Sequence, residues 1–166
     1  VTLTKTPVKE QVICSVDLGI NTDAVCTIMR PDGTILGRKF INFPSDKDRM
    51  YRVLGRIRRF QREHGSRQVQ GRWAYAKRLN TELGRKIARE IVLYASGNKA
   101  DVIVFEYLEM KGKLSGKKKQ KLQMWRKRDI QKRCGQQAHR KGIRISRICA
   151  WNTSRLAFDL SLIHIS

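Results

Sequence analysis

Acidic residues are scarce in this 166-residue chain, which contains 14 Asp and Glu against 36 Lys and Arg. The net charge of +22 predicts a polyanionic partner, and nucleic acid fits that description best. A solvated surface without a specific partner is the alternative. The charge is unevenly spread along the chain, which favours the first interpretation.

Paired cysteines and long apolar runs are also missing. The four cysteines form no C-x-x-C pair, so we expect buried free thiols rather than a metal site or disulfides. No apolar run is long enough to span a bilayer, and no signal peptide is recognisable. We therefore expect a cytoplasmic protein without a membrane partner.

The two ends of the sequence indicate a fragment. The chain begins at Val1 without an initiator Met, and its closing heptapeptide LSLIHIS resembles the translated read-through of a sequencing adapter. We expect residues 1–11 to be the remnant of a preceding region. Residues 159–166 are expected to be a non-native tail, with authentic sequence ending near Phe158 or Asp159.

The basic residues concentrate in two segments. Residues 111–147 hold fifteen Lys or Arg and one acid, and residues 45–90 hold fourteen basic and five acidic residues. The remaining segments are nearly neutral. With 40% apolar residues, the chain can form one globular core. This distribution predicts basic helices and loops mounted on an uncharged sheet.

The hydrophobic periodicity predicts five strands and three helices. Strands are expected at 12–18, 24–29, 35–43, 100–110 and 144–149, with the turn RPDGT joining the second and third. The first helix is expected to begin with a cap at Ser45 or Asp46 and to end before EHGSRQVQG, and the second follows that stretch and ends at Gly97. The third is expected to follow the basic loop 111–121 and to run to about Lys141. The order β-β-β-α-α-β-α-β predicts an α/β or α+β layered fold with a mixed sheet whose first three strands are antiparallel.

Asp17 and Glu106 are the only acids embedded in strongly apolar, strand-like runs. An ionised carboxylate inside a sheet is costly unless something pairs with it. Paired carboxylates on adjacent strands commonly hold divalent cations, and Mg²⁺ or Mn²⁺ would suit oxygen ligands of this kind. The alternative is that both acids are solvated at strand ends.

The sequence resembles the RuvC-like nuclease domain of the TnpB transposon-encoded and type V CRISPR effector nucleases. SVDLGIN, residues 15–21, is similar to the first catalytic motif of that family, and VIVFEYL, residues 102–108, to the second. WNTSRLAFD, residues 151–159, resembles its TS segment. The resemblance implies an RNase H-like mixed sheet over residues 12–158, a partial domain with a basic helical insertion at about 45–98.

The resemblance further implies an RNA-guided DNA endonuclease, with guide RNA and target DNA as partners, in a prokaryotic or mobile-element host cell. Asp17 and Glu106 would hold the catalytic Mg²⁺. Ala157 stands where the family begins a zinc ribbon with Cys, so zinc is unsupported. The family's third catalytic Asp lies beyond that ribbon, so we expect the fragment to cleave poorly or not at all.

Phosphate contacts are expected mainly from the third helix and the loop before it. The candidate residues are Lys117, Lys118, Lys119, Lys121, Arg126, Lys127 and Arg128. The run GKKKQK is equally consistent with a disordered, solvated loop. The three tryptophans, Trp73, Trp125 and Trp151, could stack on bases, although core packing is favoured for each.

Two rival functions stay open at this point. An actin-like or sugar-kinase-like ATPase would share the topology, but the sequence lacks a second Asp-Gly phosphate motif and a Gly-rich adenosine site. A non-catalytic nucleic-acid-binding protein would have the same charge. Loss of metal-dependent cleavage on replacing Asp17 or Glu106, with binding retained, would separate a nuclease from a binder.

Overall fold

The computed structural model describes residues 11–19, 21–106, 118–148 and 164–165. Its centre is a six-stranded sheet in the order β3-β2-β1-β4-β5-β6. The strands are β1 (Ile13–Leu18), β2 (Ala24–Met29), β3 (Ile35–Ile41), β4 (Val102–Glu106), β5 (Arg144–Ile148) and β6 (His164–Ile165). Strands β1, β2 and β3 are antiparallel, whereas β4 runs parallel to both β1 and β5.

The turn between β2 and β3 forms for local reasons. Gly33 adopts a positive φ of 92°, which a residue without Cβ does readily. The Asp32 carboxylate accepts a hydrogen bond of 2.9 Å from the Thr34 backbone N–H. The Arg30 N–H donates to the Thr34 carbonyl across the turn. The predicted antiparallel hairpin is therefore confirmed.

Three helices complete the fold: α1 (Pro44–His64), α2 (Gln70–Gly97) and α3 (Lys118–Arg140). The predicted side-chain cap at Ser45 or Asp46 is wrong, because α1 begins one residue earlier at Pro44. Proline suits the first helical position, where its missing N–H costs nothing. The N-cap is Phe43, whose backbone N–H donates to the Asp23 carboxylate at 2.7 Å.

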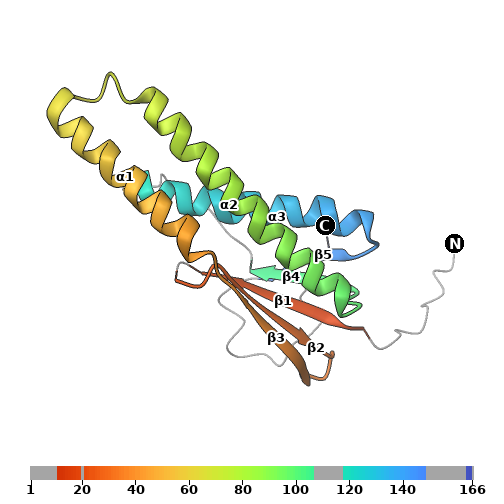
Figure 1. Cartoon of the computed structure of the whole chain (residues 1–166). Helices are drawn as coiled ribbons and strands as arrows, with labels where there is room; N and C mark the ends of the chain where they lie inside the picture. The colour runs from red at the N-terminus through yellow and green to blue at the C-terminus, as the bar shows by residue number, and fades with distance from the viewer. Residues whose placement is uncertain (1–10, 20, 107–117, 149–163, 166) are drawn as a thin grey trace, which may run out of the picture.

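Helices α2 and α3 cover one face of the sheet (Figure 1). Alternate strand residues such as Cys14, Val16 and Phe105 point to this face and join the main core with Ile87 and Ile130. The other alternation, which includes Ile13, Val102 and Val104, forms a separate small cluster on the opposite face. The topology thus assigns every second residue of β1 and β4 to the face away from the helices.

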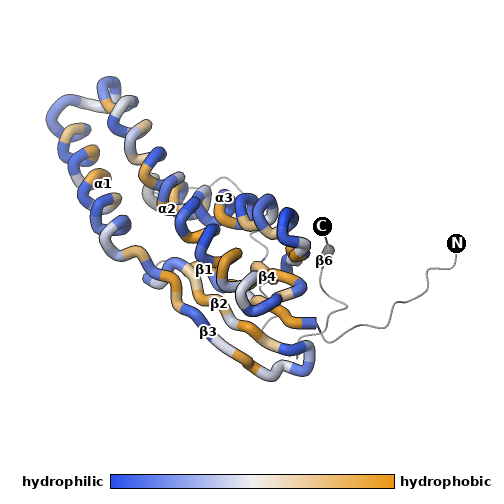
Figure 2. Tube along the Cα trace, turned by 45° about the vertical axis from the view of Figure 1, so that its right-hand side comes forward, coloured by the Kyte–Doolittle hydropathy of each residue, from blue (hydrophilic) through white to orange (hydrophobic). Residues whose placement is uncertain are grey.

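The helices α1 and α2 form a hairpin that extends beyond the sheet (Figure 1). Its own core contains Met50, Leu54, Ile57 and Ala76, with Leu122 of α3 packed against it. Figure 2 shows hydrophilic residues along much of this hairpin, interspersed with the hydrophobic residues that face inward. The predicted basic helical segment at about 45–98 corresponds to these two helices.

The predicted order of the first five strands and the three helices and the RNase H-like mixed sheet are confirmed, and the boundaries shift by a few residues. The short strand β6, which lies within residues 159–166, was not predicted. The third strand ends at Ile41 rather than residue 43. The fourth strand spans Val102–Glu106 within the predicted 100–110, of which residues 107–110 lie outside the described residues. Within the described part of the chain, no helix is both long and apolar enough to cross a bilayer.

Three cysteines lie close together where the sheet packs against the helices. Cys14, Cys26 and Cys134 are buried free thiols, as expected, while Cys149 lies outside the described residues. A hydrogen bond with Cys26, followed by burial, raises the pKa of the Cys14 thiol far above its usual range. Burial likewise raises the pKa of the Cys134 thiol. Both thiols therefore stay protonated, which makes them poor nucleophiles.

We predict that Cys14 and Cys134 resist iodoacetamide in the folded protein even near pH 8.5, where a solvated cysteine is about half thiolate. Peptide mass spectrometry would show labelling of both sites only after addition of denaturant. Labelling of either site in the native protein as fast as in the denatured protein would contradict the buried, protonated state.

Candidate metal centre

Asp17 and Glu106 lie next to each other at the carboxyl edge of the sheet. The parallel pairing of β1 with β4 ends at Val16 opposite Phe105, so Asp17 and Glu106 are the next residues of the two strands in the same register. Neighbouring strands are about 4.8 Å apart, and residues in register point to the same face. The predicted proximity of the two acids on adjacent strands therefore follows from this pairing.

Both carboxylates are exposed, and the expectation that Asp17 is buried inside the sheet is wrong. The physical reason is that β1 ends one residue later, at Leu18, and β4 ends at Glu106 itself. Both acids also belong to the face that α2 and α3 do not cover. Among the described residues, neither carboxylate takes part in a hydrogen bond or an ion pair.

The chain turns sharply just after Asp17, and Gly19 makes that turn possible. A Cβ at this position would lie 2.6 Å from the Thr22 carbonyl oxygen, a distance that real Cβ atoms essentially never show. The Gly19 N–H donates to the carbonyl of Asp23, which closes the turn. The glycine that directly follows VDL is thus required by the backbone that carries Asp17.

Asp23 anchors the same turn to the first helix. It is only 2% exposed, and its carboxylate accepts the hydrogen bond from the Phe43 N–H and lies 3.8 Å from the Lys47 ammonium. The sequence alone does not mark this residue, because a single acid in a short stretch between two strands looks like an ordinary turn residue. The buried position follows only from the packing of α1 against the β1–β2 turn.

Helix α3 contacts the other strand of the pair. The buried Gln131 side chain donates from Nε2 to the Glu106 carbonyl oxygen at 3.0 Å. This bond holds the end of β4 against the helix while leaving the Glu106 carboxylate on the opposite face. The sequence contains no feature that marks Gln131, because its role depends on the tertiary arrangement.

The donor set fits a hard divalent cation. Carboxylate oxygens are the ligands that Mg²⁺ and Mn²⁺ prefer, and Mg²⁺ often takes only one or two from the protein. Asp17 and Glu106 offer them from neighbouring strand ends without a competing cationic side chain among the described residues. No group of three or more His, Cys, Asp or Glu with metal-binding geometry occurs in the described ranges. A magnesium site here would therefore rest on two protein ligands from these ranges.

The predicted phosphate contacts divide into three groups. Lys121 and Arg128 are exposed and Lys127 is half-buried on α3. Arg126 is 8% exposed and donates to the Asn80 side chain at 3.3 Å, so its guanidinium braces α3 against α2 and is not a surface contact. Lys117 and the side chains of Lys118 and Lys119 lie outside the described residues.

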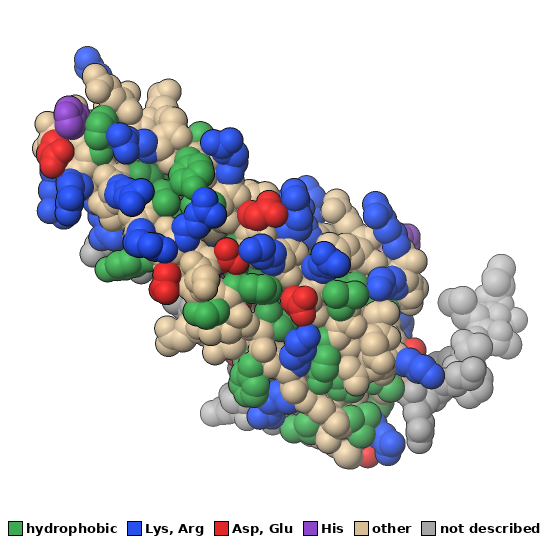
Figure 3. Space-filling model, viewed as in Figure 1, with side chains coloured by type: hydrophobic (Ala, Val, Ile, Leu, Met, Phe, Trp, Pro, Cys, Tyr) green, Lys and Arg blue, Asp and Glu red, His purple; other side chains and the backbone are tan. Residues whose placement is uncertain are grey.

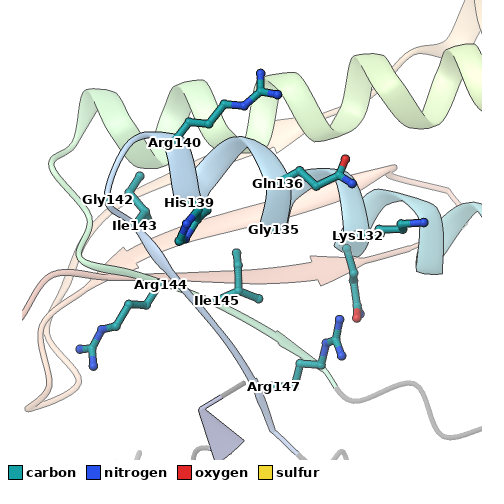
Figure 4. A pocket seen from close by; sticks show the side chains of 11 residues that line it. Lys132, Gly135, Gln136, His139, Arg140, Gly142, Ile143, Arg144, Ile145 and Arg147 are labelled. Atoms are coloured by element: carbon teal, nitrogen blue, oxygen red, sulfur yellow. The ribbon is translucent and has the colours of Figure 1, made fainter.

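Basic side chains are not confined to α3. In Figure 3, blue Lys and Arg side chains cover much of the α1–α2 hairpin, with only a few red acids between them. A second basic region is a groove of about 860 Å³ between α3 and β5. Its described lining includes Lys132, Arg140, Arg144 and Arg147 but no acid. In Figure 4, Arg140 at the end of α3 and Arg144 at the start of β5 extend in opposite directions.

The comparisons with known proteins find no matching family model and no matching curated protein. Solved structures do match. The Cas12f1–sgRNA–target DNA complex superimposes with a TM-score of 0.62 at 18% identity, over 87% of this chain and 37% of that chain. A CRISPR-Cas12f ternary complex gives a TM-score of 0.60 at 19% identity, over 90% of this chain and 32% of that chain. This chain shares the fold of part of Cas12f.

The structural likeness agrees with the predicted resemblance to a RuvC-like nuclease domain. It is a likeness of fold, because the identities are below 20%. The chain spans about a third of the length of the Cas12f chains it matches. T. thermophilus RuvC in complex with a Holliday junction matches with a TM-score of 0.46 at 8% identity, a level that supports no conclusion about function.

We predict that Gly19→Ala destabilises the fold by about 1–3 kcal/mol, because the new methyl group would overlap the Thr22 carbonyl. Urea unfolding followed by circular dichroism would measure the change. Gly55→Ala is the matched control, since a Cβ there meets nothing within 4 Å in the interior of α1 and is expected to stabilise by up to about 1 kcal/mol. Equal stability of the two variants would contradict the role of Gly19.

Proposed function

We propose that residues 12–158 form part of the RuvC-like nuclease domain of an RNA-guided DNA endonuclease, of the TnpB or type V CRISPR effector kind. The observation that carries the proposal is the parallel register of β1 and β4, which makes Asp17 and Glu106 neighbours at one edge of the sheet. The order of the sheet and the fold shared with part of Cas12f support it.

Asp17 and Glu106 would hold Mg²⁺ at this edge. Bound there, the ion would supply activation of water and stabilisation of the leaving oxygen in phosphodiester hydrolysis. The protein's own contribution is positional. The turn at Gly19 and the bond from Gln131 to the Glu106 carbonyl fix the two strand ends, and the exposed carboxylates leave room for a phosphate to approach.

Guide RNA and target DNA are the proposed partners. One of the two matching Cas12f structures is a complex with sgRNA and target DNA, and the other is a ternary complex. In this chain the exposed Lys121 and Arg128, with Lys127 beside them, would contact the phosphate backbone. Lys117, Lys118 and Lys119 are proposed to extend this contact. Binding should weaken steeply with salt because such contacts release counterions.

Metal binding provides a test that needs only this chain. Calorimetric titration with Mn²⁺ should show binding that Asp17→Asn and Glu106→Gln each weaken by about tenfold or more, because each variant removes a charged oxygen ligand. Glu82→Gln is the matched control, since Glu82 is an exposed acid on α2, away from this edge. Wild-type affinity in both site variants would refute the assignment of the ligands.

Cleavage tests the activity in the full reading frame that encodes this chain. With guide RNA and Mg²⁺, we expect cleavage of target DNA that Asp17→Ala or Glu106→Ala reduces at least a hundredfold while leaving DNA binding intact. A gel assay for cleavage and a filter assay for binding would separate the two effects. Undiminished cleavage in either variant would place the catalytic centre elsewhere. Binding without metal-dependent cleavage in the wild type would favour a non-catalytic nucleic-acid-binding protein.

A further inference from the structure

A groove of about 710 Å³ lies between the first half of α2 and the first half of α3. Its described lining combines two tryptophans and two lysines and includes no acid; the residues used below are Trp73, Lys77, Thr81, Lys121, Leu122 and Trp125. Its volume falls within the range of pockets that bind small organic groups. The metal edge does not use any of these residues.

The two tryptophans differ in their environment. Trp73 packs against the core of the α1–α2 hairpin, which agrees with the favoured prediction of core packing. Trp125 is 47% exposed, so core packing is not its role. Trp125 lines the groove, where its half-exposed side chain is accessible to a partner. Its flat face is suited to stacking on a nucleobase.

The charges around the groove match a nucleic-acid strand. Lys77 and Lys121 are both exposed on its walls, so their ammonium groups can reach phosphates that flank a stacked base. A lining that combines Trp125 and Leu122 with two lysines resembles the general arrangement by which single strands are bound: aromatic platforms for bases and cations for the backbone.

The groove can be located along α3 relative to the end of β4. Gln131, which bonds the carbonyl of Glu106, lies six residues after Trp125 on the same helix. At 1.5 Å per residue, Trp125 is therefore displaced by about 9 Å along α3 from the end of β4. The two carboxylates lie on the opposite face of the sheet, so the groove is a separate site on the side that α2 and α3 cover.

We propose that this groove binds an unpaired base of single-stranded DNA, with Trp125 stacking on the base and Lys77 and Lys121 holding its flanking phosphates. The inference rests on the proposed function for the identity of the strand, but not on the metal ligands. It identifies a stacking site on the side of the sheet that the helices cover, separate from the edge where Asp17 and Glu106 lie.

Fluorescence anisotropy of a labelled oligothymidine of about ten nucleotides tests the proposal with the full chain. Trp125→Ala should weaken binding roughly 5- to 150-fold, the range expected for losing one stacked base, and Trp125→Phe should retain most of the affinity. Lys77→Gln and Lys121→Gln should each reduce the slope of log affinity against log salt by about 0.7. Trp125→Ala should leave that slope unchanged.

Tyr75→Ala is the matched aromatic control, because Tyr75 is an exposed aromatic of α2 outside the lining of the groove. Equal affinities of Trp125→Ala and Tyr75→Ala would overturn the proposal. Trp125→Ala should bind Mn²⁺ with the affinity of the wild type, because the described lining of the groove contains neither Asp17 nor Glu106. The stacking site and the metal site can therefore fail independently of each other.

Oligouridine of the same length checks the nature of the strand. An equal effect of Trp125→Ala on both oligonucleotides supports the proposal, since stacking does not read the sugar, whereas an effect on oligouridine alone would overturn the assignment to DNA. Sedimentation of wild type and Trp125→Ala tests whether a second copy of the chain occupies the groove instead. Dissociation of a dimer by this substitution would make the groove an interface between copies and overturn the proposal.

Discussion

The parallel pairing of β1 with β4 is the constraint on which the rest of the structure depends. Parallel neighbours cannot be joined by a tight turn, so the chain must leave the sheet after β3 and return by way of α1 and α2. That long connection carries much of the basic charge. The same pairing brings the carboxyl ends of two strands distant in sequence to one edge, with Asp17 and Glu106 in register.

The sequence was sufficient to predict that the two acids are neighbours, but not that their side chains are exposed. Apolar runs with a period of two identify strands, and the order of the elements makes the first and fourth strands neighbours. Where a strand ends depends on the turn that follows it. The steric limit at Gly19 and the hydrogen bonds of Asp23 set that end, so Asp17 is exposed although Ile13, on the same face of β1, is buried.

In helix α3, the sequence likewise could not predict which single side chains are buried. Its charge predicted a basic surface, yet Arg126 is buried against Asn80 while Trp125, the preceding residue, is half exposed. Adjacent residues on a helix point about 100° apart, so a small rotation of α3 about its axis decides which of them meets α2. The contact at Gly84, where Asp129, Arg126 and Ile130 approach closely, sets that rotation, and composition alone cannot reveal it.

On the proposed function, a divalent cation would reconcile the exposed carboxylates with the basic helices. A positive surface attracts a phosphate backbone, but a phosphate that reaches the sheet edge meets two carboxylates without a cationic partner among the described residues. At a separation of about 4 Å, each like-charge pair costs between about 1 kcal/mol in water and 4 kcal/mol near a protein surface. A divalent cation between the groups reverses the sign of both interactions. On the proposed function, the same two acids would therefore repel DNA in the absence of metal and attract it once the metal is bound.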